Sequence, residues 1–423
     1  MLIDDYRLLA VENHYLQLDE VEVYATISSN EVIYQGKGAI SRDSDSRLSI
    51  IIWSTPSFLF EEKREDITQE FQEEQSVSQH NTCRMNARDQ LGRWWSDCEI
   101  LVTEISNNAE GAILKAEVVS FVLKMPKDFL HETNEREVEI ISIHNGYLPF
   151  IFEEKIDKSL IVDLSFSAAG VFIKISKDIP CTKIVLKYKD LVDRINVNVL
   201  LEAISISSGK VLTPLLMSWS DKEYTYLEML HGETDNHEML PMLEVITPFR
   251  IQDFELFVEC YLSTFSTPYE ETYAAWHRAY LGTNSGVEIS SLALCTAIEG
   301  IVKYRFTDAT PMNSTNRDEL ENAIVKIMDL EASNWIVEII IKNLERVKEA
   351  KPTIRKSLKI FSQSNGISNK QLSRWESLRN KIAHFDRIGG SFEENEKLID
   401  DYNICLEIFF KLIARSAGYN WFK

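Results

Sequence analysis

The stretch ESLRNKIAHFD (residues 376–386) combines a helical apolar pattern with an arginine, an asparagine and a histidine. Together with the residue before it, its apolar side chains recur at the spacing of one helical face: Trp375, Leu378, Ile382 and Phe385. We therefore expect a helix whose apolar stripe packs against other helices. Arg379, Asn380 and His384 lie off this stripe, so packing does not explain them.

The three polar residues do not all share one face of that helix. Asn380 and His384 are four residues apart and lie on the same face. Arg379 and His384 are five apart, which separates them by about 140° around a straight helix. The two side chains meet at one phosphate if the helix bends, if Arg379 reaches round on its long side chain, or if a second copy of the chain supplies half of the site.

An arginine and a histidine suit metal-free RNA cleavage, in which the ribose 2′-hydroxyl attacks the adjacent phosphodiester. Histidine moves protons near neutral pH because its ordinary pKa is about 6.5. Arginine is permanently charged and binds phosphate through two N–H groups at once. Asn380 would orient His384 or bind a phosphate oxygen. The alternative is structural, with His384 hydrogen-bonded in the helix and Arg379 paired with Glu376.

The charge of the chain is unevenly distributed. Its net charge of −21 opposes binding of a polyanion, but residues 286–423 hold 20 Lys and Arg against 19 Asp and Glu. Between residues 342 and 387 twelve basic residues face four acidic ones. This stretch is either a solvated helical surface or an RNA-binding surface. The candidate RNA-binding residues are Lys356, Lys359, Arg374, Lys381 and Arg387.

The N-terminal half reads as β structure. Short, β-branched, partly alternating segments recur from about residue 20 to 205, with RINVNVLLEAISIS (194–207) as the last of them. They predict a β-sandwich or a barrel-like domain. The polar stretch 61–90 predicts a long loop with room for a short helix. In RWWSD (93–97) we expect the tryptophans to be core residues rather than a stacking platform for bases.

The rest of the chain reads as helices. Candidates lie near residues 220–232, 252–266 and 269–281, and from residue 285 helices of 12 to 20 residues with short connections predict an antiparallel bundle. Ser368 and Ser391 are expected N-caps. The fold class is therefore α+β and multidomain. The expected domains are a β-rich domain (1–208), a helical connector (209–284) and a helical domain (285–423).

Common cofactor and membrane signals are missing from the sequence. It contains no phosphate-binding loop, dinucleotide fingerprint, metalloprotease motif or hydrolase elbow, and its six cysteines include no C-x-x-C pair. We expect no cofactor and no metal, and we read HGETDNHEML (231–240) as a hydrophilic loop, with a metal site as the alternative. No apolar run reaches the roughly 18 residues that span a bilayer, and the first residues are acidic. We expect a cytoplasmic protein with reduced thiols.

Two stretches resemble one protein family. RNKIAH (379–384) resembles the R-N-x-x-x-H motif of the HEPN superfamily, and SLALCTAIEGIVKYRF (291–306) resembles its first long helix, with Glu299 matching the inward-facing acidic residue. The likeness covers residues 286–423. A preceding β-rich region looks like the layout of ApeA-like HEPN proteins of bacterial anti-phage defence.

The resemblance carries specific implications for fold and function. HEPN nucleases are dimers whose motifs meet at the interface, and many cut tRNA or other RNA when phage infection is sensed. It implies catalytic or phosphate-binding roles for Arg379, Asn380 and His384, with Glu299 in support. Glu299 also has a simpler interpretation as a salt-bridging structural carboxylate. The acidic N-terminal domain would sense a phage protein or hold the nuclease inactive.

Two other classes of function remain open from the sequence. A non-catalytic HEPN module would serve as a nucleotide-binding or antitoxin-like scaffold for a partner. The intact set of Arg379, Asn380 and His384 speaks against it. A carbohydrate-binding or adhesin-like β protein with a helical dimerisation tail is the third class.

Overall fold

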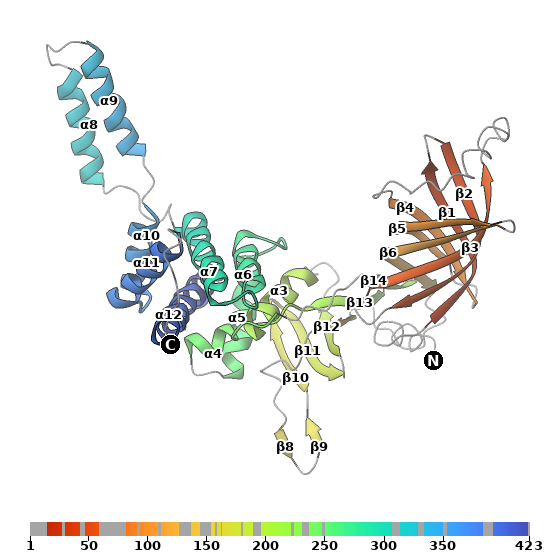
Figure 1. The fold of residues 1–423 in the computed structure, drawn as a ribbon. Coiled ribbons are helices and arrows are strands. Elements are labelled where there is room, and N and C mark those ends of the chain that lie inside the picture. The colour runs from red at the N-terminus through yellow and green to blue at the C-terminus, as the bar shows by residue number, and fades with distance from the viewer. Residues whose placement is uncertain are drawn as a thin grey trace. The chain divides into compact units, whose positions relative to one another are not determined.

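Figure 1 shows the computed structural model of the chain. It describes residues 15–27, 30–42, 47–58, 82–90, 94–108, 111–126, 137–143, 154–156, 159–161, 163–178, 181–188, 196–220, 224–230, 237–247, 250–306, 314–328, 334–349, 353–383 and 392–421. The chain forms two compact units. The first comprises Met1–Ser205 and Lys210–Asn236, and the second comprises Ile206–Gly209 and His237–Lys423.

The first unit begins with a closed antiparallel barrel. Its six strands are β1 (Tyr15–Ile27), β2 (Asn30–Arg42), β3 (Leu48–Phe58), β4 (Thr82–Asp89), β5 (Trp94–Asn108) and β6 (Gly111–Pro126). They pair in the order β6-β3-β2-β1-β4-β5, and β5 pairs back with β6 to close the ring. The expectation of a barrel-like β domain is therefore confirmed. The expected loop at 61–90 is wrong for residues 82–89, which form β4. Residues 59–81 lie outside the described ranges.

The barrel interior is filled by side chains that alternate along the strands. On β1, the side chains of Val21, Val23 and Ala25 are buried. Tyr24, which lies between Val23 and Ala25, is exposed, as the alternation of a half-buried strand requires. Trp95 is fully buried, as expected for a core tryptophan. Gly36 on β2 allows close strand packing, because a Cβ there would lie 1.9 Å from the carbonyl oxygen of Trp53.

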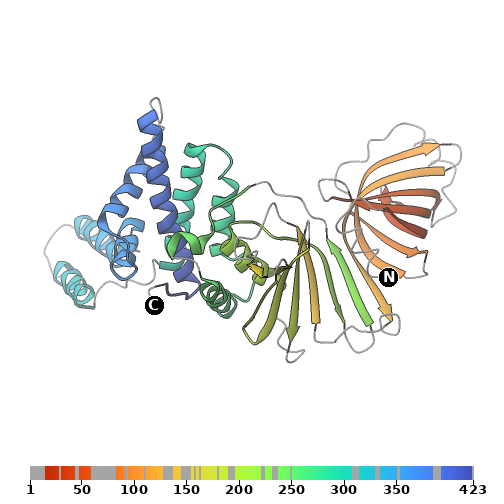
Figure 2. The ribbon, with the colours of Figure 1, turned by 90° about the horizontal axis from the view of Figure 1, so that it is seen from below.

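An open sheet continues from the barrel through β6 (Figure 2). The first half of β6 pairs with β3 of the barrel. Its second half, Ser120–Pro126, pairs with the first strand of the open sheet. The sheet order from β6 is β14 (Tyr224–Leu230), β13 (Thr213–Ser220), β7 (Glu137–Ile143), β12 (Cys181–Tyr188), β11 (Val171–Asp178) and β10 (Asp163–Ala168). A small separate hairpin joins β8 (Glu154–Ile156) and β9 (Ser159–Ile161).

Two expectations for the middle of the chain are wrong. The segment 194–207, expected as a strand, contains helix α3 (Val197–Ser208), in which every residue from Val199 onward is buried. The segment 220–232, expected as a helix, holds strand β14 instead, which pairs with β13 and β6. The interval 209–284 is therefore not helical throughout. Sheet pairing on both sides of β14 outweighs the helix preference of its Leu, Glu and Met residues.

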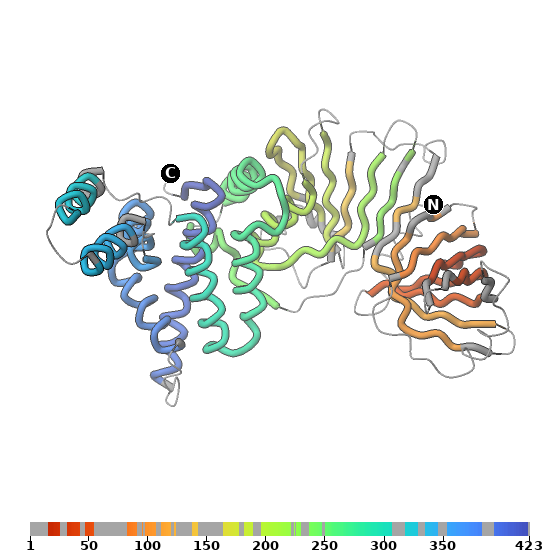
Figure 3. Tube along the Cα trace, turned by 90° about the horizontal axis from the view of Figure 1, so that it is seen from above, coloured from red at the N-terminus to blue at the C-terminus, as the bar shows by residue number. Residues whose placement is uncertain are grey.

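The second unit is helical (Figure 3). Its elements are α4 (Met242–Ile246), α5 (Ile251–Thr264), α6 (Glu271–Leu281), α7 (Val287–Ile301), the short π-helix η3 (Val302–Phe306), α8 (Ser314–Met328), α9 (Asn334–Glu349), α10 (Ile354–Ser364), α11 (Asn369–Ala383) and α12 (Phe392–Ser416). The expected helices near 252–266 and 269–281 are confirmed as α5 and α6. Helix α12, with 25 residues, is longer than expected. No described helix combines the length and the apolar composition that a membrane crossing requires.

Helices α7, α11 and α12 pack on one another and form the part of the bundle that carries the motif. On α11, Trp375, Leu378 and Ile382 are buried, so the expected apolar stripe is confirmed for these three residues. Phe385, its fourth member, lies outside the described ranges. The stripe fixes the rotation of α11 and so decides which polar residues face α7.

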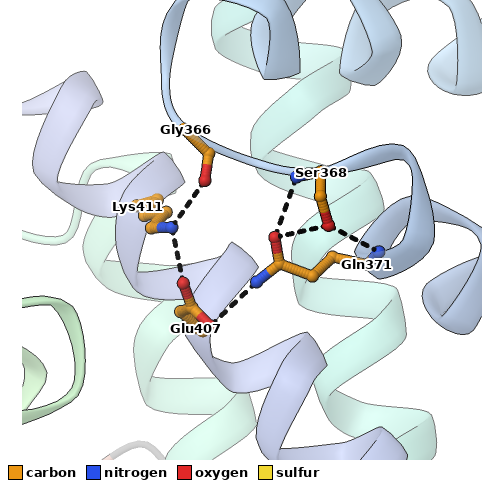
Figure 4. Close-up of polar contacts among 5 residues, drawn as sticks. All are labelled: Gly366, Ser368, Gln371, Glu407 and Lys411. Atoms are coloured by element: carbon orange, nitrogen blue, oxygen red, sulfur yellow. Dashed lines mark hydrogen bonds and ion pairs between the residues drawn. The ribbon is translucent and has the colours of Figure 1, made fainter.

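The start of α11 is fixed by a reciprocal cap (Figure 4). Ser368 Oγ accepts a hydrogen bond from the Gln371 backbone N–H at 3.2 Å, and Gln371 Oε1 accepts one from the Ser368 N–H at 2.8 Å. This confirms Ser368 as an N-cap, whereas Ser391 lies outside the described ranges. Gln371 also donates to Glu407 on α12, which pairs with the buried Lys411 at 2.5 Å. The network ties α11 to α12 at a defined register.

Candidate RNA-binding and cleavage site

The structure brings together two residues of the proposed site from helices far apart in sequence. Arg379 on α11 donates a hydrogen bond from Nε to Glu299 Oε1 on α7, and the two atoms lie 2.7 Å apart. The Arg379 side chain is 45 % exposed and that of Glu299 is 27 % exposed. The pair therefore sits at the rim of the bundle, within reach of a solvent-borne ligand.

Asn380 lies beside the same guanidinium. Its Oδ1 accepts a hydrogen bond from Arg379 Nη1 at 3.4 Å, and the residue is exposed. Arg379 Nη2 makes no hydrogen bond to a described residue. Glu299 therefore accepts from Nε, and Asn380 accepts from one N–H group of Nη1. The outer edge, with the other N–H group of Nη1 and those of Nη2, remains able to bind phosphate oxygens.

The ion pair keeps Arg379 charged. The hydrogen bond that Arg379 donates to Glu299, together with the negative charge of Glu299, raises the pKa of the Arg379 guanidinium above its ordinary value. The guanidinium is thus a fixed cation with a set orientation. Such a preoriented cation is what stabilisation of a phosphorane-like transition state requires.

Two buried thiols, Cys295 and Cys405, are in contact between α7 and α12, and no sequence pattern predicts this contact. Cys295 stands one helical turn before Glu299 on α7, and Cys405 is buried on α12. The hydrogen bond between Cys405 and Cys295, together with burial, raises the pKa of the Cys405 thiol. Cys405 is therefore a packing residue rather than a nucleophile, because the thiolate is the reactive form.

Two further arginines near the motif are engaged by carboxylates. Arg374 on α11 contacts Asp401 on α12, whose side chain is only 3 % exposed. Arg355 on α10 pairs with Glu376 on α11 at 2.5 Å. Glu376 is thus paired with Arg355, and Arg379 with Glu299, in place of the Arg379–Glu376 pair that the sequence allowed. Arg374 has a structural role in joining the two helices, and its contact with RNA stays a prediction.

The remaining candidates fall into two groups. Lys356 and Lys359 are exposed on α10, and Lys381 is partly exposed on α11. No described carboxylate forms an ion pair with these three lysines. His384 and Arg387 lie outside the described ranges, beyond the end of α11 at Ala383. The structure thus assembles Arg379, Asn380 and Glu299, while the position of His384 stays a prediction.

Comparisons of the chain with family models, with curated proteins and with solved structures return no match. The resemblance to HEPN proteins therefore rests on the motif residues Arg379, Asn380, His384 and Glu299 alone.

Proposed function

We propose that the chain is a metal-independent HEPN-type endoribonuclease. In this proposal it cleaves tRNA or another cellular RNA in the cytoplasm and leaves 2′,3′-cyclic phosphate ends. It acts as a homodimer through its helical region and needs no cofactor. The resemblance to ApeA-like proteins extends the proposal to an abortive-infection role in anti-phage defence, in which the β-rich region senses a phage protein.

The observation that supports this function best is the contact between Arg379 and Glu299. The family resemblance implied a supporting acid on the first helix and an arginine on the motif helix, 80 residues apart in this chain. Their side chains are in hydrogen-bond contact at an exposed rim, next to Asn380.

The proposal gives each residue a separate task. Arg379 binds the scissile phosphate through its outer edge and stabilises the charge that builds on it. Glu299 holds the guanidinium in place. His384 moves the proton of the 2′-hydroxyl or of the leaving oxygen. Asn380 binds a phosphate oxygen or orients His384, and the exposed lysines of α10 and α11 contact the flanking backbone.

One observation favours a second candidate, a non-catalytic module that binds a nucleotide or a partner. Glu299 already neutralises much of the Arg379 charge in the chain as it stands, which is how a structural arginine is held. In this alternative the motif stabilises the bundle and no RNA is cut. The two candidates differ in whether RNA is consumed.

The test incubates the purified full chain with total tRNA in the presence of EDTA and maps the new RNA ends. The proposal predicts cleavage that persists in EDTA and ends that carry a 2′,3′-cyclic phosphate. Expression of the wild-type chain should arrest growth, whereas His384→Ala should not. Intact RNA together with equal growth of both strains would support the non-catalytic alternative and contradict the proposal.

A further inference from the structure

The hairpin of α8 and α9 carries a concentrated group of exposed apolar side chains. These are Val325, Met328, Trp335, Ile336, Ile339 and Ile340, which are between 39 % and 64 % exposed. Figures 1 and 3 show α8 and α9 side by side. We name these six side chains the hairpin patch. Its members lie at the end of α8 and on the first two turns of α9.

The patch is separate from the face by which the two helices hold each other. On α9, Val337, Ile341 and Leu344 are partly buried, and they lie roughly 110–170° further round the helix than the centre of the patch. Helix α9 is therefore apolar over more than half of its circumference. A helix that packs against one neighbour needs only one apolar stripe, so the second stripe calls for a second neighbour.

We propose that the hairpin patch binds the same patch of a second copy of this chain and forms a four-helix arrangement across a twofold axis. Two antiparallel helix pairs that bury their apolar faces together are a stable packing unit, whereas a lone pair of short helices is marginal in water. A self-complementary patch closes into a dimer and leaves no surface for further growth.

The size of the patch agrees with this occupant. The exposed parts of the six apolar side chains amount to roughly 600 Å² per chain, or about 1,200 Å² for two copies, which lies at the lower end of the range for specific dimers. Trp335, at 64 % exposure, is the large aromatic anchor that such interfaces favour.

The charge around the patch also favours a second copy over an anionic partner. Helix α9 holds three acidic residues, Glu338, Glu345 and Glu349, and three basic ones, Lys342, Arg346 and Lys348. A helix with equal numbers of positive and negative side chains does not repel an identical helix. It also offers no net positive charge to RNA. Nucleic acid is therefore the poorer occupant of this face.

The experiment measures the mass of the full chain in solution by sedimentation from about 1 to 100 µM, the range in which an interface of this size associates. The variants are Ile336→Glu and Ile339→Glu. The matched control is Ile399→Glu, which places the same charge on an exposed isoleucine of α12. We expect a dimer for wild type and for the control, and a monomer for both hairpin variants, with unchanged circular dichroism for all.

Cross-linking gives a second, position-specific readout. In a twofold dimer a single cysteine in the patch faces its own copy, so Ile340→Cys should form a disulfide-linked dimer under mild oxidation, and Ile399→Cys should not. A monomeric wild type at 100 µM, or hairpin variants that remain dimers, would overturn the inference. The inference assigns the interface of the homodimer in the proposed function and rests on that part of it. Hairpin variants that remain dimers overturn the hairpin interface alone, whereas intact RNA with a dimeric wild type overturns the nuclease alone.

Discussion

Glu299 on α7 and Arg379 on α11 form a hydrogen-bonded ion pair, with Oε1 2.7 Å from Nε, across 80 residues of sequence. Because both side chains reach solvent, the pair contributes less than about 1 kcal/mol to the free energy of unfolding. Its value in the proposed enzyme is the orientation that it gives to the guanidinium.

Glu299→Gln should therefore lower RNA cleavage much more than it lowers stability. We expect a loss of at least about tenfold in the cleavage rate, since Arg379 is no longer held in position, and a melting temperature within a few degrees of wild type. The double variant Glu299→Gln with Arg379→Ala should cleave RNA almost as fast as Arg379→Ala alone, because the acid acts through the arginine. A loss in the double variant equal to the sum of the two single losses would show that Glu299 acts on its own.

Lys411 on α12 is a stability residue. It is buried and donates to Glu407 Oε1 at 2.5 Å and to the carbonyl oxygen of Gly366 at 3.0 Å. Lys411→Met should destabilise the chain by about 2 kcal/mol, since it leaves a carboxylate and a carbonyl group without their donor. Urea unfolding measures this. Lys397→Met, on an exposed position of the same helix, should leave the midpoint unchanged.

The cap at the start of α11 predicts a smaller loss. Gln371→Ala removes the acceptor for the Ser368 backbone N–H and the donor to Glu407, and it should cost about 1 kcal/mol of stability. Gln363→Ala, at an exposed position of α10, is the matched control. Thermal unfolding of both variants gives the comparison, and equal midpoints would show that the cap is not needed to fix the helix start.

Tyr34 in the barrel predicts a change at high pH. Its hydroxyl is buried without a hydrogen-bond partner among the described residues, and burial, with a contribution from Cys83, raises its pKa to about 12. The unfolded chain releases this proton near pH 10. Between about pH 10 and 12 the folded state therefore binds the extra proton, and stability falls as pH rises.

Tyr34→Phe should remove this part of the alkaline loss. At neutral pH the variant should be as stable as wild type or slightly more stable, because a buried unpaired hydroxyl is lost. Chemical unfolding at pH 7 and pH 11 tests both statements. A strong destabilisation at pH 7 would mean that the hydroxyl has a partner that stabilises the barrel.

The sequence predicted the features that depend on local pattern. The stripe of Trp375, Leu378 and Ile382 follows from helical periodicity, and the Ser368 cap follows from local chemistry. Two of the ion pairs could also have been predicted from their positions in the sequence. In the sequence, Arg355 and Glu376 are nearly symmetric about Gly366, and Arg374 and Asp401 about Ile388. Antiparallel helices joined by a glycine turn bring such positions together.

Other features could not be predicted because tertiary context decides them. Helix α3 is buried on all sides, so its sequence has no amphipathic period and reads as a strand. Strand β14 has helix-favouring residues, and its two neighbours in the sheet determine its conformation. The Glu299–Arg379 contact joins elements separated by a whole hairpin. No spacing rule connects them, and only the resemblance pointed to Glu299.

The measurement that tests the central claim most directly is the single-turnover cleavage rate of tRNA by wild type, Arg379→Ala and His384→Ala, with Arg355→Ala as the control. Arg355 on the neighbouring helix α10 pairs with Glu376 on α11 and has no proposed role in cleavage. We predict losses of at least about 100-fold for the first two variants and less than about twofold for the control. Arg379→Ala and His384→Ala enzymes that cleave at the wild-type rate would contradict the account.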